Sequence, residues 1–279
     1  MSKHSLPLSV SFPPLGKMNS VDGLRMVAEH GFDSMDFTIN NIVEHFGDDW
    51  LNETYRAKEA LQKSPLIVTT GHLPFRGGDD LHERILRGIE VAGILGLKKG
   101  VLHPIGSRTA DDTAEARRRW FEKNIEYYNT YLPYAEKAGI TLVTENMRDP
   151  LHGQGKHRYA SCADELIELA DTLGLEICWD FGHANEAGLD QYTEIKKLGS
   201  RLTMTHVNDN WGANDEHIPP FYGQTDWDGA MRALGEIGYS DPLNFELKFK
   251  KLPPEILPEA LHLVRRIGEL LLDKIDAAR

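Results

Sequence analysis

Six short apolar segments of the sequence are each followed, directly or after one residue, by a histidine or an acidic residue. In chain order, these residues are His72, His103, Glu145, Asp180 with His183, His206 and Glu246. Carboxylate and imidazole side chains hold Mn²⁺, Mg²⁺, Co²⁺ or Zn²⁺ and leave coordination positions open for the oxygens of a substrate. One such residue would more often be a helix cap or an ordinary loop residue, but six in succession predict a divalent metal site.

Two further candidate ligands lie in the segment after His206. Asp215 and His217 are two positions apart, so both could reach one ion if the segment is extended. A divalent ion that holds a carbonyl oxygen and its neighbouring hydroxyl would stabilise the enediolate formed when the proton on the intervening carbon is removed. Two carboxylates on either side of that carbon could deliver and accept the proton.

The elements that would position these side chains are eight apolar segments that alternate with eight helical segments. The expected strands are 6–12, 33–39, 66–70, 100–102, 140–144, 175–179, 202–205 and 242–245, and the expected helices are 20–30, 51–62, 81–95, 113–137, 162–173, 191–198, 226–237 and 258–275. This α/β alternation is typical of a (β/α)8 TIM barrel, which would form one domain over residues 1–279. In such barrels the C-terminal ends of the strands surround one shared cavity. A doubly wound open sheet is the alternative, but no glycine-rich fingerprint follows the first strand.

The charge balance argues against a nucleic-acid partner. The 279 residues include 43 acidic and 31 basic side chains, which gives a formal net charge of −12 at pH 7. A field of that sign repels nucleic acids and acidic membranes, and the loop expected at 44–53 is itself acidic. No apolar run approaches the ~18 residues that cross a bilayer, and no signal-peptide core precedes residue 12. Cys162 and Cys178 form neither a CxxC pair nor a disulfide framework, so we expect a cytoplasmic protein.

The order and spacing of the candidate residues resemble a known family. The matching segments are Glu145-Asn146, Asp180-Phe-Gly-His183, His206-Val-Asn-Asp209, Asp215-Glu-His217 with Gly223-Gln-Thr-Asp226-Trp227, and Asn244-Phe-Glu246. Together they resemble the xylose isomerase-like TIM barrel superfamily and, within it, the sugar phosphate isomerase/epimerase branch. The resemblance extends over nearly the whole chain and implies an enzyme that acts on a small sugar or related polyol ketone.

The resemblance also implies roles for individual residues. Glu145, Asp180, His206 and Glu246 are similar to the four metal ligands of the ketose 3-epimerases and hydroxypyruvate isomerases. The two glutamates would also be the acid/base pair that transfers a proton through a metal-bound enediolate, and His183 would contact substrate oxygens. Mn²⁺ is the expected ion, with Mg²⁺, Co²⁺ or Zn²⁺ as alternatives, and pairing into a homo-oligomer is implied as well. The epimerases place an arginine in the loop after the seventh strand, where this chain has Asp215 and His217.

Three other functions would use the same residues. An inosose-type lyase or dehydratase would share the first step and then lose hydroxide from the β carbon. Endonuclease IV, a trinuclear zinc phosphodiesterase of the same superfamily, has a fuller set of ligands. This set is matched by His72, His103 and Glu145 at a first site, by Glu145, Asp180, His206 and Glu246 at a second, and by His183, Asp215 and His217 at a third. A sugar-binding barrel without catalysis is the remaining class.

A basic segment follows Glu145 in this otherwise acidic chain. It runs from Arg148 to Arg158 and includes His152, Lys156 and His157. Two interpretations stay open, because the segment could bind a phosphate or carboxylate of the substrate or could be an ordinary solvated loop. Arg148 is the candidate substrate contact from this segment, and Trp211 is a candidate for stacking on the apolar face of a sugar.

Overall fold

Eight parallel strands form a nearly closed barrel in the computed structural model, which describes residues 4–12, 18–75, 78–249 and 252–279. The strands are β1 Leu8–Phe12, β2 Ser34–Thr38, β3 Ile67–His72, β4 Lys99–Val101, β5 Thr141–Glu145, β6 Glu176–Asp180, β7 Leu202–His206 and β8 Leu243–Phe245. They pair in the order β7-β6-β5-β4-β3-β2-β1-β8. A parallel bridge between Val207 and Phe245 joins the two ends of this sheet. The structure therefore confirms the predicted (β/α)8 TIM barrel.

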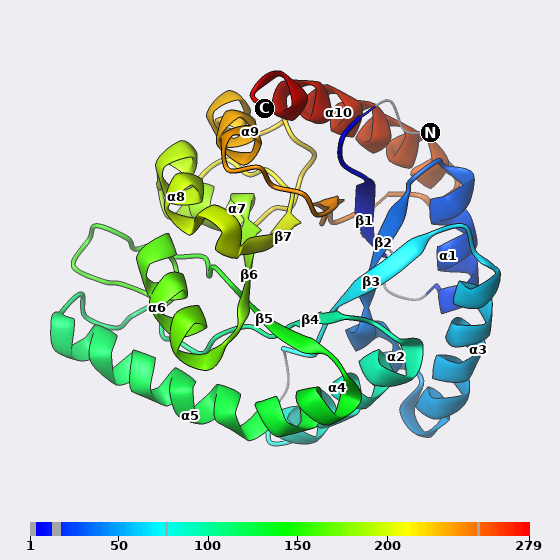
Figure 1. The fold of residues 1–279 in the computed structure, drawn as a ribbon, viewed down its shortest axis with the longest axis horizontal. Helices are drawn as coiled ribbons and strands as arrows, with labels where there is room; N and C mark the ends of the chain where they lie inside the picture. The colour runs from blue at the N-terminus through cyan, green and yellow to red at the C-terminus, as the bar shows by residue number, and fades with distance from the viewer. Residues whose placement is uncertain (1–3, 13–17, 76–77, 250–251) are drawn as a thin grey trace.

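Helices surround the barrel on its outside (Figure 1). They are α1 Ser20–Glu29, α2 Ile39–His45, α3 Trp50–Lys63, α4 Leu81–Leu95, α5 Ala114–Ala138, α6 Ala163–Leu173, α7 Phe181–Glu186, α8 Gln191–Leu198, α9 Trp227–Glu236 and α10 Leu257–Ala277, with short 3-10 helices η1 Gly47–Asp49, η2 Gly199–Arg201 and η3 Pro254–Ile256. The eight predicted helices are confirmed with small shifts at their ends. The sequence did not indicate α2 and α7, which are one or two turns long and follow directly on strands. The prediction of an acidic loop at 44–53 was wrong, because α2, η1 and α3 occupy that segment.

Glycine residues end two of the predicted helices. Gly139 follows α5 with φ 72°, and Gly174 follows α6 with φ 69°. Glycine adopts this left-handed conformation without the steric cost that a Cβ imposes, so it terminates a helix and turns the chain toward the next strand.

Among the described residues, the structure contains no helix with the length and apolar character that a bilayer crossing requires.

Inside the barrel, a layer of apolar side chains lies next to the candidate ligands, toward the N-terminal ends of the strands. Val101, Val143, Cys178 and Met204 are buried and form a cluster of their own, apart from the larger core between sheet and helices. Each lies two residues before one of the candidate ligands His103, Glu145, Asp180 and His206. Alternate residues of a strand point to the same face, so the candidate site has an apolar floor.

Candidate metal centre

Four side chains converge at the C-terminal ends of the strands. Glu145, Asp180 and His206 are the last residues of β5, β6 and β7, and Glu246 directly follows β8. One ligand atom from each lies within 4.8 Å of the others. His206 Nδ1 is 2.9 Å from Glu145 Oε1 and 3.4 Å from Glu246 Oε2. Three carboxylates and one imidazole so close together are a suitable donor set for a divalent ion, and we call these four residues the central group.

Burial and mutual attraction set the charges of the central group. Burial opposes ionisation of Glu145, but His206 and His103 outweigh it and lower the pKa of this carboxyl well below its usual range. Burial also opposes protonation of His206, whereas its neighbours Cys178, Glu145 and Glu246 raise its pKa well above its usual range. A negative potential that favours an imidazolium ion favours a divalent cation for the same reason.

A second group adjoins the central group and shares Glu145 with it. His72 is the last residue of β3, and His103 lies two residues beyond β4. His103 Nε2 is 3.0 Å from His72 Nε2 and 3.0 Å from Glu145 Oε2. Burial lowers the pKa of His103 to about 4, which keeps this imidazole in the neutral form that binds metals.

A third group shares Asp180 with the central group. One ligand atom each from Asp180, His183 of α7 and His217 lies within 4.8 Å of the others. Asp215 Oδ1 is 2.8 Å from His217 Nε2 and 3.7 Å from His183 Nε2. Burial opposes protonation of His217, but Glu246 and Asp215 raise its pKa to about 9. All nine candidate ligands named from the sequence therefore meet at one end of the barrel.

Two asparagines hold Asp180 in place. Asn208 Nδ2 donates to Asp180 Oδ2 at 2.7 Å, and Asn146 Oδ1 accepts the backbone N–H of Asp180 at 2.6 Å. The other carboxylate oxygen of Asp180 accepts the backbone N–H of His183 at 2.7 Å and so caps α7. Such outer contacts fix the orientation of a metal ligand. Sequence reasoning gave the asparagines no role, although both lie within the quoted segments.

Asp36 is another buried residue near the site that was not predicted from the sequence. It lies in β2, is fully buried and accepts a hydrogen bond from Ser11 Oγ at 3.2 Å. Burial raises its pKa, while the charges of His206 and His72 act in the opposite direction. A charged residue inside a short apolar run was the signal that could have identified it.

A pocket of about 340 Å³ adjoins the second and third groups. His103, His183 and Asp215 line it together with Arg108, Arg148 and Arg158. Arg148 pairs with Glu186 at 2.5 Å. Trp211 is 57% exposed and is not among the residues that line this pocket. The structure thus places Arg148 beside the candidate ligands, whereas the stacking role of Trp211 stays a prediction.

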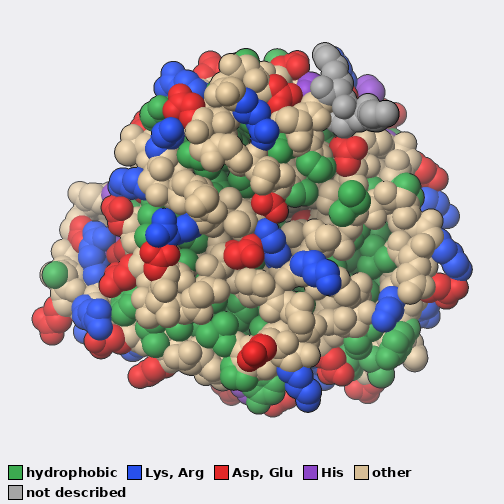
Figure 2. Space-filling model, in the orientation of Figure 1, with side chains coloured by type: hydrophobic (Ala, Val, Ile, Leu, Met, Phe, Trp, Pro, Cys, Tyr) green, Lys and Arg blue, Asp and Glu red, His purple; other side chains and the backbone are tan. Residues whose placement is uncertain are grey.

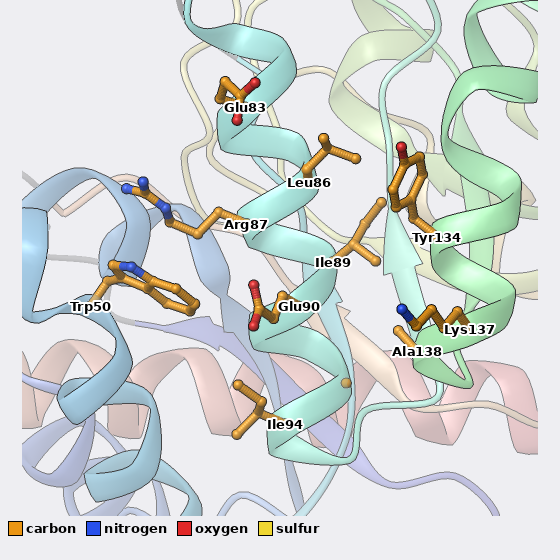
Figure 3. A pocket seen from close by; sticks show the side chains of 11 residues that line it. Trp50, Glu83, Leu86, Arg87, Ile89, Glu90, Ile94, Tyr134, Lys137 and Ala138 are labelled. Carbon is orange, nitrogen blue, oxygen red and sulfur yellow. The ribbon is translucent and has the colours of Figure 1, made fainter.

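A wider pocket of about 770 Å³ lies in the outer layer of helices, away from the candidate ligands. Figure 3 shows its lining, with Trp50 from α3, Leu86 and Ile89 from α4, and Tyr134 from α5. None of the nine candidate ligands lines it, so we assign it no part in the chemistry. Acidic and basic side chains intermingle on the face in Figure 2, where neither sign gathers in one patch.

Two curated relatives match parts of the chain. An uncharacterized protein of Sinorhizobium fredii is 26% identical over 164 residues, which are 59% of this chain and 51% of that protein. An uncharacterized protein of Methanocaldococcus jannaschii is 31% identical over 148 residues, which are 51% of this chain and 50% of that protein. The chain spans about half the length of these relatives.

Solved structures share the barrel over nearly its whole extent. A crystal structure of an IolI protein with a bound zinc atom has a TM-score of 0.74 at 19% identity and covers 97% of this chain and 99% of that one. A D-tagatose 3-epimerase-like protein gives 0.71 at 20% identity, covering 97% and 100%. A 3-keto-D-glucoside 4-epimerase of E. coli gives 0.68 at 17% identity, covering 94% and 99%. At these identities the likeness establishes the fold.

The sequence match extends over most of the barrel. The family model described as xylose isomerase-like TIM barrel matches residues 24–267, a range that runs from α1 into α10. This range contains all nine candidate ligands, and the barrel that it forms has the fold the description names. The chain therefore belongs to the xylose isomerase-like TIM barrel family.

Proposed function

We propose that the protein is a divalent-metal-dependent sugar isomerase or epimerase that transfers a proton through an enediolate. The observation that carries the proposal is the presence of two glutamates, Glu145 and Glu246, in one group with Asp180 and His206. Glu145 ends β5 and Glu246 follows β8, which are three strands apart around the ring. The two carboxylates therefore approach the centre from different sides, as an acid/base pair around one carbon atom requires.

The charges of the two glutamates suit this role. Burial opposes ionisation of Glu246, but His206 and His217 lower its pKa, and Glu145 is shifted in the same direction. An ionised carboxylate can take the proton from the substrate carbon. If the same carboxyl returns it to the neighbouring carbon, the reaction is an isomerisation. If the other carboxyl enters the reaction protonated and delivers its own proton to the opposite face, while the first keeps the proton it took, the reaction is an epimerisation.

The central group would hold the metal. A divalent ion bound there would stabilise the negative charge that develops on the substrate oxygen. Asn146 and Asn208 orient Asp180 as a ligand, and His183, which lines the adjoining pocket, would orient a substrate hydroxyl. Three of the four donors are carboxylates, which supports Mn²⁺ as the ion, and the zinc in the IolI structure supports a divalent metal in general.

The pocket supports a substrate with an anionic group. Arg108, Arg148 and Arg158 line it beside His103 and His183. Arg158 forms no ion pair with a carboxylate in the described part of the chain, and its Nε is buried without a hydrogen-bond partner. Guanidinium groups bind phosphate through paired, charge-assisted hydrogen bonds. A sugar phosphate therefore fits the pocket better than a neutral sugar.

Glu246→Gln tests the acid/base assignment. Wild type, loaded with Mn²⁺ and incubated with a panel of ketoses and ketose phosphates in D₂O, should incorporate deuterium at the carbon next to the carbonyl. Glu246→Gln should retain the metal and lose about 10²- to 10⁴-fold in turnover. Glu259→Gln, at an exposed position of α10, is the control. Full turnover in Glu246→Gln with metal still bound would remove Glu246 from the mechanism.

The three adjoining groups favour a second candidate, a phosphodiesterase with several zinc ions. Glu145 belongs to both the central and the second group, and Asp180 belongs to both the central and the third group, so neighbouring ions would lie close enough to act on one phosphate. Cleavage of bis(p-nitrophenyl) phosphate by the zinc-loaded protein, without deuterium incorporation into any ketose, would favour this function. Loss of water from an inosose, detected as an enone product, would identify the lyase instead.

A further inference from the structure

The segment between β5 and α6 carries a separate set of ligand-type side chains. Asp149, His152 and His157 belong to none of the groups around Glu145, and one ligand atom from each lies within 4.8 Å of the others. Asp149 is fully buried, His157 is nearly so, and the side chain of His152 is 33% exposed. Two buried ligands with a third that solvent reaches would allow an ion to enter and then hold it.

The two distances from Asp149 match those between neighbouring ligand atoms of a tetrahedral zinc site. Asp149 Oδ2 lies 3.3 Å from His157 Nδ1 and 3.4 Å from His152 Nδ1. Zinc bonds of about 2.0–2.2 Å at tetrahedral angles place neighbouring ligand atoms roughly 3.3–3.6 Å apart. A direct N–H···O hydrogen bond would be shorter, at about 2.9–3.0 Å.

A second carboxylate orients His157. His157 Nε2 lies 2.7 Å from Glu165 Oε1, and Glu165 is itself held by the Ala160 backbone N–H at 2.7 Å and by Arg117 at 3.0 Å. A proton on Nε2 that is donated to Glu165 leaves the lone pair of Nδ1 directed toward Asp149. Histidine ligands of metals usually donate their other N–H to a carboxylate in this manner.

Polar atoms in the set lack partners. Asp149 Oδ1, His152 Nδ1 and His157 Nδ1 are buried and have no hydrogen-bond partner among the described residues. A protonated His157 between Asp149 and Glu165 would account for one of these atoms. It would leave His152 Nδ1 without a partner, whereas an ion held by Asp149 Oδ2 and the two imidazoles engages Nδ1 of both histidines.

We propose that Asp149, His152 and His157 bind one divalent transition-metal ion that stabilises the segment carrying Arg148 and Arg158. Two imidazoles and one carboxylate favour Zn²⁺. The segment is already joined to the loop after β4, because His157 N–H donates to the Ala110 carbonyl at 3.0 Å and Asp112 N–H donates to the Gly155 carbonyl at 3.1 Å. None of the three ligands belongs to the central group, so the inference does not depend on the proposed function.

The zinc content of His152→Ala tests the site. His152 is the most exposed of the three ligands, so its removal leaves the buried contact between His157 and Glu165 in place. Full-length wild type, His152→Ala and the control His262→Ala, an exposed position of α10, are stripped with a chelator, equilibrated with buffered Zn²⁺ and analysed by mass spectrometry. We expect His152→Ala to hold one zinc ion fewer per chain than the other two proteins. Asp180→Asn should lose zinc from the central group and keep the ion bound near Asp149.

Two further readouts identify the ion's position. Co²⁺ in a tetrahedral site absorbs strongly in the visible range, and part of this absorption should be missing in His152→Ala. Zn²⁺ should slow tryptic cleavage after Lys156 in wild type and leave the cleavage rate of His152→Ala unchanged. Equal zinc contents of wild type and His152→Ala, with cleavage independent of zinc in both, would overturn the proposal and leave His157 as an imidazolium ion between two carboxylates.

Discussion

Glu145 Oε2 lies 3.0 Å from His103 Nε2, while the other oxygen of this carboxylate lies 2.9 Å from His206 Nδ1. One side chain therefore belongs both to the group with His72 and to the central group. A carboxylate can bridge two divalent ions in this way, and paired metal sites hold their ions about 3.5–4 Å apart.

Substitution of His103 should distinguish metal binding by the second group from metal binding by the central group. We expect His103→Ala to lower the zinc content by one ion per chain and Glu145→Ala to lower it by two, because only Glu145 contacts both histidines. Equilibrium dialysis against buffered Zn²⁺ followed by metal analysis measures the difference, with His82→Ala on α4 as the control. An unchanged zinc content in His103→Ala would mean that His72 and His103 bind substrate and no second ion.

A methyl group at Gly182 should disturb the orientation of Asp180. A Cβ built on Gly182 would lie 1.9 Å from Asn208 Oδ1, and Asn208 donates to Asp180 Oδ2 at 2.7 Å. Gly182→Ala must therefore displace Asn208, and we expect both Gly182→Ala and Asn208→Ala to weaken metal binding about 10- to 100-fold. Gly78→Ala is the matched control, since nothing lies within 4 Å of a Cβ there. Wild-type affinity in Asn208→Ala, measured by competition with a chelating dye, would contradict this role.

The residues at the strand ends could be predicted from the sequence for two reasons. Each strand is a short apolar run, and in a barrel the residue after such a run points into the shared cavity, so Glu145, Asp180 and His206 could be named together. Asp36 escaped this reasoning because it lies inside β2. Which face of the strand it occupies depends on the register with β1 and β3, which the sequence of β2 does not contain.

In the segment after β5, the directions of the side chains could not be predicted from the sequence. Arg148, His152, His157 and Arg158 belong to one basic stretch, yet the structure divides them. Arg148 and Arg158 line the pocket, whereas His157 contacts Glu165 and faces Asp149. An irregular segment has no period, so the direction of each side chain follows from backbone contacts with other loops, such as the one between His157 and Ala110.

Lys99 should stabilise the barrel without affecting the candidate site. It begins β4, at the end opposite the ligands, and its Nζ lies 3.0 Å from Asp241 Oδ1 and 2.9 Å from Glu176 Oε2. We expect Lys99→Met to lower the free energy of unfolding by about 1–3 kcal/mol, because two partly buried carboxylates lose their partner. Urea denaturation measures the change, and the exposed Lys98→Met should show almost none. Metal affinity should be unchanged in both variants.

The pH dependence of this effect has a definite sign. Burial opposes the charge of Lys99, but Glu176 and Asp241 raise its pKa above the usual value. A raised pKa contributes stability that is fully present below the unfolded value of about 10.4 and is lost as the pH rises through the folded value. The difference in stability between wild type and Lys99→Met should therefore be the same at pH 7 and pH 9. A difference that disappeared by pH 9 would show that Lys99 is not the charged partner of these carboxylates.

Arg158→Met should have opposite effects on stability and on binding. Burial, followed by the charges of Arg108 and Arg148, lowers the pKa of Arg158 to about 10, and its buried Nε has no hydrogen-bond partner. Removing this unpaired cation relieves repulsion, so the melting temperature should stay the same or rise. An anionic substrate would lose one charge-assisted contact worth about 1.5–3 kcal/mol, so KM for a ketose phosphate should rise roughly 10- to 150-fold. KM for the unphosphorylated ketose should change little, and Arg266→Met, exposed on α10, should change neither value. A fall in melting temperature with an unchanged KM for the phosphate would show that Arg158 is structural and that the pocket binds a neutral sugar.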